Sequence, residues 1–86
     1  MPERIDPQAL RRRIQYRASH RGTKEMDILL GHFAAAALDG MTEGEMALFE
    51  QMLALPDPDI DSWIRGGAPP EIYADLIERI RKFHRF

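Results

Sequence analysis

A cation, a glycine and an anion stand close together at Arg21, Gly22 and Glu25. Arg and Glu side chains can form charge-assisted hydrogen bonds with another molecule, and glycine can adopt backbone conformations that other residues avoid. Glu25 is expected in the first turn of a helix, where backbone NH groups have no partner within the helix. This spacing predicts a polar surface site at the junction of two helices.

A simpler interpretation of the same residues stays open. Arg and Glu four positions apart can form an ion pair that stabilises a helix by roughly a few tenths of a kcal/mol, and a glycine can simply mark a helix end. At about 100° per residue, however, Glu25 lies to one side of the apolar face that contains Met26 and Phe33. We therefore expect Glu25 to be accessible.

The elements that position this junction are helices, which we predict over about residues 7–20, 24–39, 43–54, 58–65 and 70–84. Asp6-Pro7 and Asp57-Pro58 each combine a capping residue with a proline at the first helical position. Thr42-x-x-Glu45 has the pattern of a capping box. No segment shows the alternation of a strand. We predict an all-α fold, a single-domain compact five-helix bundle over residues 1–86.

Each expected helix has one apolar face, formed by residues three or four positions apart. The residues expected to face the core are Leu10, Ile14 and Ala18; Met26, Leu29, Leu30, Phe33 and Ala37; Met46, Phe49, Met52 and Leu53; Ile60, Ile64 and, in the core or at its edge, Trp63; and Tyr73, Leu76, Ile77, Ile80 and Phe83. The connections are short, so consecutive helices should pack as neighbours.

Composition disfavours several classes of protein. The 86 residues include no cysteine, which excludes disulfides and thiolate metal sites. His20, His32 and His84 lack the four-residue spacing of a helical zinc site, and no G-x-S-x-G nucleophile elbow occurs. No apolar run approaches the roughly 20 residues of a membrane span, and no signal peptide is recognisable. We expect a mature cytoplasmic protein with no metal site, no catalysis of its own and no insertion into a membrane.

Charge is segregated along the chain beneath a net charge of −2. Residues 1–24 carry seven Lys or Arg and two acids, residues 25–78 carry twelve acids and one Arg, and the last eight residues carry four cations. The run Arg11-Arg12-Arg13 could bind phosphate. We favour a solvated helix face, because the acidic middle would repel a nucleic acid.

Three motifs agree, in order and spacing, with one known family. They are Arg21-Gly22-x-x-Glu25-Met26-Asp27 with Leu30, then Met41-Thr42-x-x-Glu45-x-x-x-Phe49-x-x-Met52-Leu53, then Pro56-Asp57-Pro58-Asp59-Ile60 with Trp63. In these residues the chain resembles the SdhE-like family of FAD assembly factors of succinate dehydrogenase, whose mitochondrial relatives promote covalent flavin attachment. The agreement extends from about residue 10 to residue 83.

This resemblance implies an assembly factor, not an enzyme, that binds the flavoprotein subunit of succinate dehydrogenase or fumarate reductase. It implies that no cofactor is held permanently and that the FAD belongs to the client. Carried over residue by residue, the client-binding surface consists of Arg21, Gly22 and Glu25, with Asp27 as a neighbour. His20 stands where relatives often have a second Arg, so its protonation is expected to modulate docking.

The resemblance also suggests a role for each residue of this surface. We hypothesise that Gly22 allows close approach of the client, that Glu25 accepts hydrogen bonds from client groups near the flavin, and that Arg21 pairs with a client carboxylate. We expect the factor to be a monomer. The alternative is an antitoxin-type regulatory interaction module, a description that relatives have also received, and a nucleic-acid binder ranks third.

Overall fold

The computed structural model describes residues 6–86, which form five α-helices and one short 3₁₀-helix. In chain order these are α1 (Pro7–Ser19), α2 (Lys24–Ala37), the 3₁₀-helix η1 (Leu38–Gly40), α3 (Glu43–Leu53), α4 (Asp57–Ile64) and α5 (Glu71–His84). No strand occurs in these 81 residues, 6 to 86. The predicted all-α fold is confirmed, while residues 1–5 of the predicted domain lie outside the described residues.

Three helices begin at side-chain caps, and the sequence predicted those at Asp6 and Thr42. Asp6 accepts a backbone NH of α1 at 3.4 Å, and Thr23 accepts one of α2 at 3.2 Å. At the start of α3 the capping box is complete: the backbone NH of Glu45 donates to Thr42 Oγ1 at 3.1 Å, and the NH of Thr42 donates to Glu45 Oε1 at 2.8 Å. These caps satisfy NH groups that a helix cannot satisfy internally.

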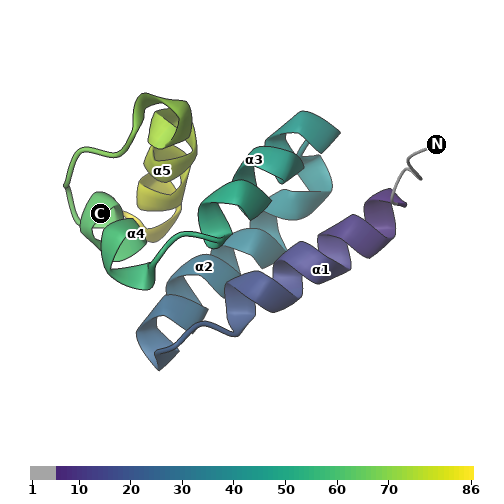
Figure 1. Ribbon diagram of the computed structural model, residues 1–86, viewed down its shortest axis with the longest axis horizontal. Helices are drawn as coiled ribbons and strands as arrows, with labels where there is room; N and C mark the ends of the chain where they lie inside the picture. Colours follow the sequence, from purple (N-terminus) through teal and green to yellow (C-terminus); the bar gives the residue numbers. More distant parts are fainter. Residues whose placement is uncertain (1–5) are drawn as a thin grey trace.

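Figure 1 shows α1, α2 and α3 lying side by side, with α4 and α5 at one end of this group. Helix α1 packs on α2 and α3, and α5 packs on α2, α3 and α4. The molecule measures 40 × 27 × 22 Å. Helix α2 therefore contacts both groups, and its N-terminus faces the helix pair at the end of the molecule. Within residues 6–86, no helix is long and apolar enough to span a bilayer.

The apolar faces meet in one core, in which nearly all of the residues predicted to face inward are buried. Ala37 and Trp63 lie at its edge, and the Trp63 ring stacks on Tyr73 with centroids 6.2 Å apart. The prediction for Phe83 was wrong, because its residue surface is 44% exposed. Its ring still packs against the Phe33 ring in a T-shaped arrangement, with the ring centroids 5.8 Å apart. Phe83 lies in the last turn of α5, where the neighbouring His84 still contacts α2: its Nε2 lies 2.7 Å from the carbonyl of Leu29.

Two predicted helix ends also differ from the structure. The second helix was expected to continue to residue 39, but α2 stops at Ala37 and the chain tightens into η1, as often happens at helix ends. The NH of Met41 donates to the carbonyl of Leu38 at 3.1 Å. Asp57 was expected to cap α4, yet the capping position is occupied by Pro56, and Asp57 is the first helical residue. The Asp57 carboxylate is thereby available for other contacts.

The segregated charges of the sequence partly neutralise one another between helices. Arg13 of α1 binds the Glu50 carboxylate of α3 through Nε and Nη2, at 2.6 and 2.7 Å, and Arg17 lies 3.6 Å from the same carboxylate. This bidentate contact raises the pKa of the Arg13 guanidinium. Part of the basic first helix is thus matched by acids of the middle segment, which weakens its footprint for a polyanion.

Candidate functional site

Arg21 fastens the junction between α1 and α2 to the connection that precedes α4. Its Nε and Nη2 lie 2.9 and 2.7 Å from Asp57 Oδ1, and Nη2 also donates to the carbonyl of Leu55 at 3.3 Å. Nη1 donates to the carbonyl of Arg17, one turn back in α1, at 3.3 Å. The Arg21 side chain is only 11% exposed. Arg21 therefore joins three parts of the fold.

The backbone of the junction is held by two carboxylates. The NH of Arg21 donates to Asp27 Oδ1 at 2.5 Å, and the NH of Gly22 donates to Asp57 Oδ2 at 3.2 Å. Asp57 thus uses one oxygen for the Arg21 side chain and the other for the Gly22 backbone. The predicted site residue Asp27 fixes the path of the chain as it enters α2, and the sequence did not predict a role for Asp57 at the site.

Gly22 is exposed, and its conformation corrects one expectation. Among the described glycines only Gly66 has a positive φ, so Gly22 does not use a backbone conformation closed to other residues. A Cβ at Gly22 would meet only Asp57 Oδ2, at 3.8 Å, which is an ordinary contact. Nothing within the described part of the chain requires a glycine here.

Glu25 lies in the first turn of α2 with its side chain 65% exposed, as predicted. The ion pair between Arg21 and Glu25 that the simpler interpretation offered does not form. Instead Glu25 Oε1 accepts a hydrogen bond from Arg65 Nη2 at 2.5 Å, and Arg65 Nε donates to Asp61 Oδ1 at 2.9 Å. These two carboxylates raise the pKa of Arg65, Asp61 first and Glu25 second.

Gly22 and Glu25 border an open depression of about 480 Å³ between the start of α2 and α4. Its lining residues are Gly22, Thr23, Glu25, Met26, Asp57, Pro58 and Asp61. Met26 and Pro58 supply apolar surface, and the three carboxylates supply hydrogen-bond acceptors. The depression is too open to enclose a flavin, but its shape and polarity suit a protruding polar group of a partner protein.

His20 lies beside the junction at the C-terminal end of α1. Its Nδ1 lies 2.8 Å from the carbonyl of Tyr16, and the two rings stack with centroids 3.9 Å apart. A ring NH at this position satisfies one of the carbonyls that the end of a helix leaves without a partner. His20 thus contacts its own helix, while its exposed surface and that of Tyr16 adjoin the junction.

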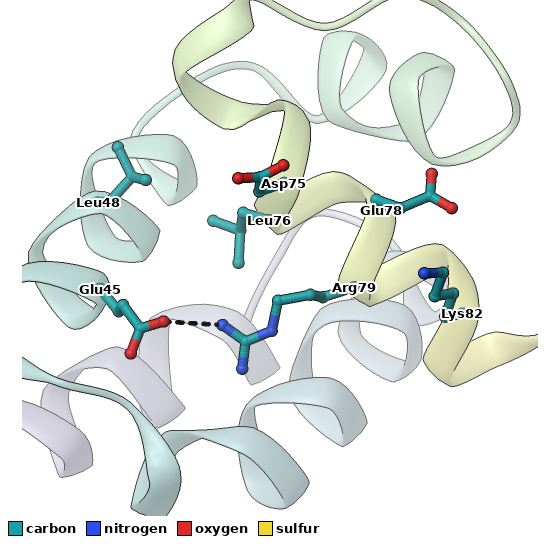
Figure 2. A pocket seen from close by; sticks show the side chains of 7 residues that line it. All are labelled: Glu45, Leu48, Asp75, Leu76, Glu78, Arg79 and Lys82. Atoms are coloured by element: carbon teal, nitrogen blue, oxygen red, sulfur yellow. Dashed lines mark hydrogen bonds and ion pairs between the residues drawn. The ribbon is translucent and has the colours of Figure 1, made fainter.

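A second hollow, of about 490 Å³, lies between α3 and α5. Figure 2 shows Leu48 and Leu76 facing each other across it, and the ion pair between Glu45 and Arg79, 3.3 Å long, at one end. The backbone NH of Thr42, more than Arg79, lowers the pKa of the Glu45 carboxyl. None of the five predicted site residues lies here. Within residues 6–86, this hollow included, no group of three or more His, Asp or Glu could hold a metal ion.

Comparison with known proteins places this geometry in context. A family model described as flavinator of succinate dehydrogenase matches residues 12–84, which include all five predicted site residues. The chain is 48% identical over 61 residues to an FAD assembly factor SdhE of Acetobacter pasteurianus, which covers 71% of this chain and 56% of that protein. It is 32% identical over 74 residues to a mitochondrial succinate dehydrogenase assembly factor 2 of Dictyostelium discoideum, covering 84% of this chain and 52% of that protein.

A third relative is close to this chain in length. The chain is 32% identical over 83 residues to an FAD assembly factor SdhE of Idiomarina loihiensis, covering 94% of this chain and 90% of that protein. It spans only about half the length of the first two relatives. All three names describe an assembly factor, and none of them describes an antitoxin, so the alternative prediction has no support among these relatives.

Proposed function

Because this chain belongs to the family of flavinators of succinate dehydrogenase, we propose that it docks on the flavoprotein subunit of that enzyme in the cytoplasm and promotes covalent attachment of FAD there. In this proposal the chain acts as a monomer and holds no FAD of its own. The flavoprotein subunit of fumarate reductase is a second client that the resemblance implies. The observation that carries the proposal is the exposed pair of Gly22 and Glu25 on a firmly held junction.

The residues of the junction fall into two groups, one that holds the backbone and one that is exposed to a partner. Arg21, Asp27 and Asp57 bind one another or nearby backbone and hold the chain in place. Gly22 and Glu25 are exposed beside the depression and can meet a partner. The hypothesis that Arg21 pairs with a client carboxylate stays an untested prediction. Because the Arg21 guanidinium already binds Asp57, we favour another role, in which Arg21 holds the docking surface in shape.

A docked helical protein can promote flavin attachment without supplying a chemical group. Covalent attachment requires the flavin ring and the acceptor histidine of the client to meet in a reactive geometry. Fixing such a geometry can lower a barrier by roughly several kcal/mol. In this proposal the depression receives a polar segment of the client, Glu25 accepts its hydrogen bonds, and the absence of a side chain at Gly22 permits close contact.

The test measures covalent flavin fluorescence of the succinate dehydrogenase flavoprotein subunit, incubated with FAD in the presence or absence of this chain. We expect Glu25→Ala to abolish the stimulation while the circular dichroism spectrum and Tm stay nearly unchanged, because Glu25 makes only an exposed ion pair within the fold. Glu71→Ala is the matched control, since Glu71 is also an exposed glutamate in the first turn of a helix.

The two possible failures have different meanings. If the wild-type chain gives no stimulation with either flavoprotein subunit, the proposed function is wrong. If the wild type stimulates and Glu25→Ala does so equally well, the function stands and the docking surface lies elsewhere.

A further inference from the structure

Arg65, the residue that follows α4, reaches Glu25 across 40 positions of sequence. Its guanidinium makes three contacts: Nη2 with Glu25 Oε1 at 2.5 Å, Nε with Asp61 Oδ1 at 2.9 Å, and its central carbon over the Phe86 ring at 5.8 Å from the centroid. An Arg that is already fixed on one side by a carboxylate and an aromatic ring loses little further freedom when it binds a second carboxylate.

The contact restricts Glu25 without consuming its binding capacity. Oε1 is engaged by Arg65, whereas Oε2 accepts no hydrogen bond from the described residues. An exposed glutamate otherwise samples several rotamers, and ordering it on docking would reduce affinity. A carboxylate held at one oxygen and open at the other is prepared for a partner.

We propose that Arg65 is a positioning residue, which orients the Glu25 carboxylate for docking of the flavoprotein client. This inference rests on the proposed function and adds a residue to it that the family resemblance did not supply. Arg65 acts through Glu25 and does not itself meet the client. Exposed ion pairs contribute little to stability, so the contact matters for geometry more than for folding.

The free protein provides the first test. In Arg65→Met, we expect the three-bond couplings of the Glu25 side chain, measured by NMR, to move toward rotamer averaging, while Tm changes little. Arg79→Met is the matched control, because Arg79 is equally exposed, at 44% against 43% for Arg65, and pairs with a glutamate at 3.3 Å. Glu25 couplings that are unchanged in Arg65→Met would overturn the proposal.

The second test is a double-mutant cycle in binding to the flavoprotein subunit. Arg65→Met should weaken binding about two- to fivefold, the range that an exposed ion pair can supply. Arg65→Lys should recover part of the loss, because lysine keeps the charge but lacks the planar fork that reaches two carboxylates. In a Glu25→Gln background, Arg65→Met should cause no further loss.

Each result of the cycle decides a separate point. Losses that add in the double variant would show that Arg65 contacts the client directly, and the positioning role would be wrong. Normal binding by Arg65→Met in the presence of a clear Glu25→Gln defect would overturn this inference and leave the proposed function intact. Absence of any binding by the wild-type chain would instead overturn the proposed function, and the inference with it.

Discussion

Two hollows of the molecule have similar volumes. The depression between α2 and α4 measures about 480 Å³, and the second hollow, which lies between α3 and α5 and is called the groove below, measures about 490 Å³. Each carries an exposed glutamate in the first turn of a helix, paired with an arginine from another segment. They differ in the state of that glutamate. Glu45 accepts hydrogen bonds at both oxygens, from the Thr42 backbone and from Arg79, whereas Glu25 uses only Oε1.

The backbone NH groups beside the two hollows are also satisfied differently. At the groove, Glu45 and Thr42 satisfy each other's NH groups and close the start of α3. At the depression, Arg21 and Asp57 make the contacts that hold the backbone, while Gly22 and Glu25 stay exposed beside them. Exposed charge and a hollow therefore do not by themselves indicate a docking site. Polar groups that the fold leaves available on a fixed backbone are the better indication.

The largest expected effect comes from removing Asp57, which holds the backbone beside the depression. Asp57→Ala leaves the largely buried Arg21 guanidinium without its carboxylate and the Gly22 NH without its acceptor. We expect the free energy of unfolding to fall by about 2–3 kcal/mol, with a loss of flavinylation stimulation as the junction loosens. Urea unfolding and the flavin fluorescence assay measure the two effects.

Asp59→Ala provides the control for that experiment. Asp59 is an exposed acid in the same first turn of α4, so its removal changes the interaction with the helix dipole without touching Arg21. Its cost should be about 0.5 kcal/mol. Equal costs for the two variants would mean that the Arg21–Asp57 contact does not support the junction.

A smaller and more selective change tests the exposed backbone. Gly22→Ala should leave Tm unchanged or slightly raised, since φ is ordinary and the new methyl group would meet only Asp57 Oδ2 at 3.8 Å. Binding to the flavoprotein subunit should weaken, because the methyl group occupies space that a close partner needs. Titration calorimetry with the flavoprotein subunit measures this.

Gly44→Ala, next to Glu45 in the sequence, is the matched control. A Cβ at Gly44, in the first turn of α3, would meet only Thr42 Oγ1 at 3.9 Å. This variant should bind the client normally. If Gly22→Ala also binds normally, the client does not approach the junction closely, and the distinction between the two regions loses its main support.

The fold was predictable because burial in helices follows a local pattern. Spacings of three and four residues identified nearly all core positions, and Asp6 and Thr42 marked helix starts. The prediction for Phe83 failed because periodicity gives a direction around a helix, not the depth of burial: the ring contacts Phe33 at the edge of the core and stays 44% exposed. The prediction of Asp57 as a cap failed because α4 begins one residue earlier and the Asp57 carboxylate binds Arg21 and the Gly22 NH instead.

The site was predictable only in part, since its contacts join distant segments. Arg21 pairs with Asp57, 36 positions away, and Glu25 pairs with Arg65, 40 positions away. The four-residue spacing of Arg21 and Glu25 was misleading because α2 begins at Lys24, so Arg21 precedes the helix and lacks the geometry of a helical pair. No spacing rule could have selected Asp57 or Arg65 before the packing of α4 was known.

The smallest expected effect is the contribution of Glu45, at the groove, to the free energy of unfolding. We expect Glu45 to matter for stability and not for client binding. Hydrogen bonding from the Thr42 backbone lowers the pKa of the Glu45 carboxyl, so the charged form stabilises the folded state. This contribution is complete above the ordinary pKa of a glutamate and is lost as pH falls through the lower pKa of the folded state. The difference in unfolding free energy between wild type and Glu45→Gln should therefore shrink as pH falls through this range.

Two variants separate the causes of this pH dependence. Arg79→Met removes the ion pair but keeps the capping box, which is the larger cause of the lowered pKa, so most of the pH dependence should remain. Both Glu45→Gln and Arg79→Met should support flavinylation normally, because the groove already uses both oxygens of its glutamate within the fold. A clear loss of flavinylation by Glu45→Gln at unchanged structure would place client contacts at the groove and reverse the assignment of the two hollows.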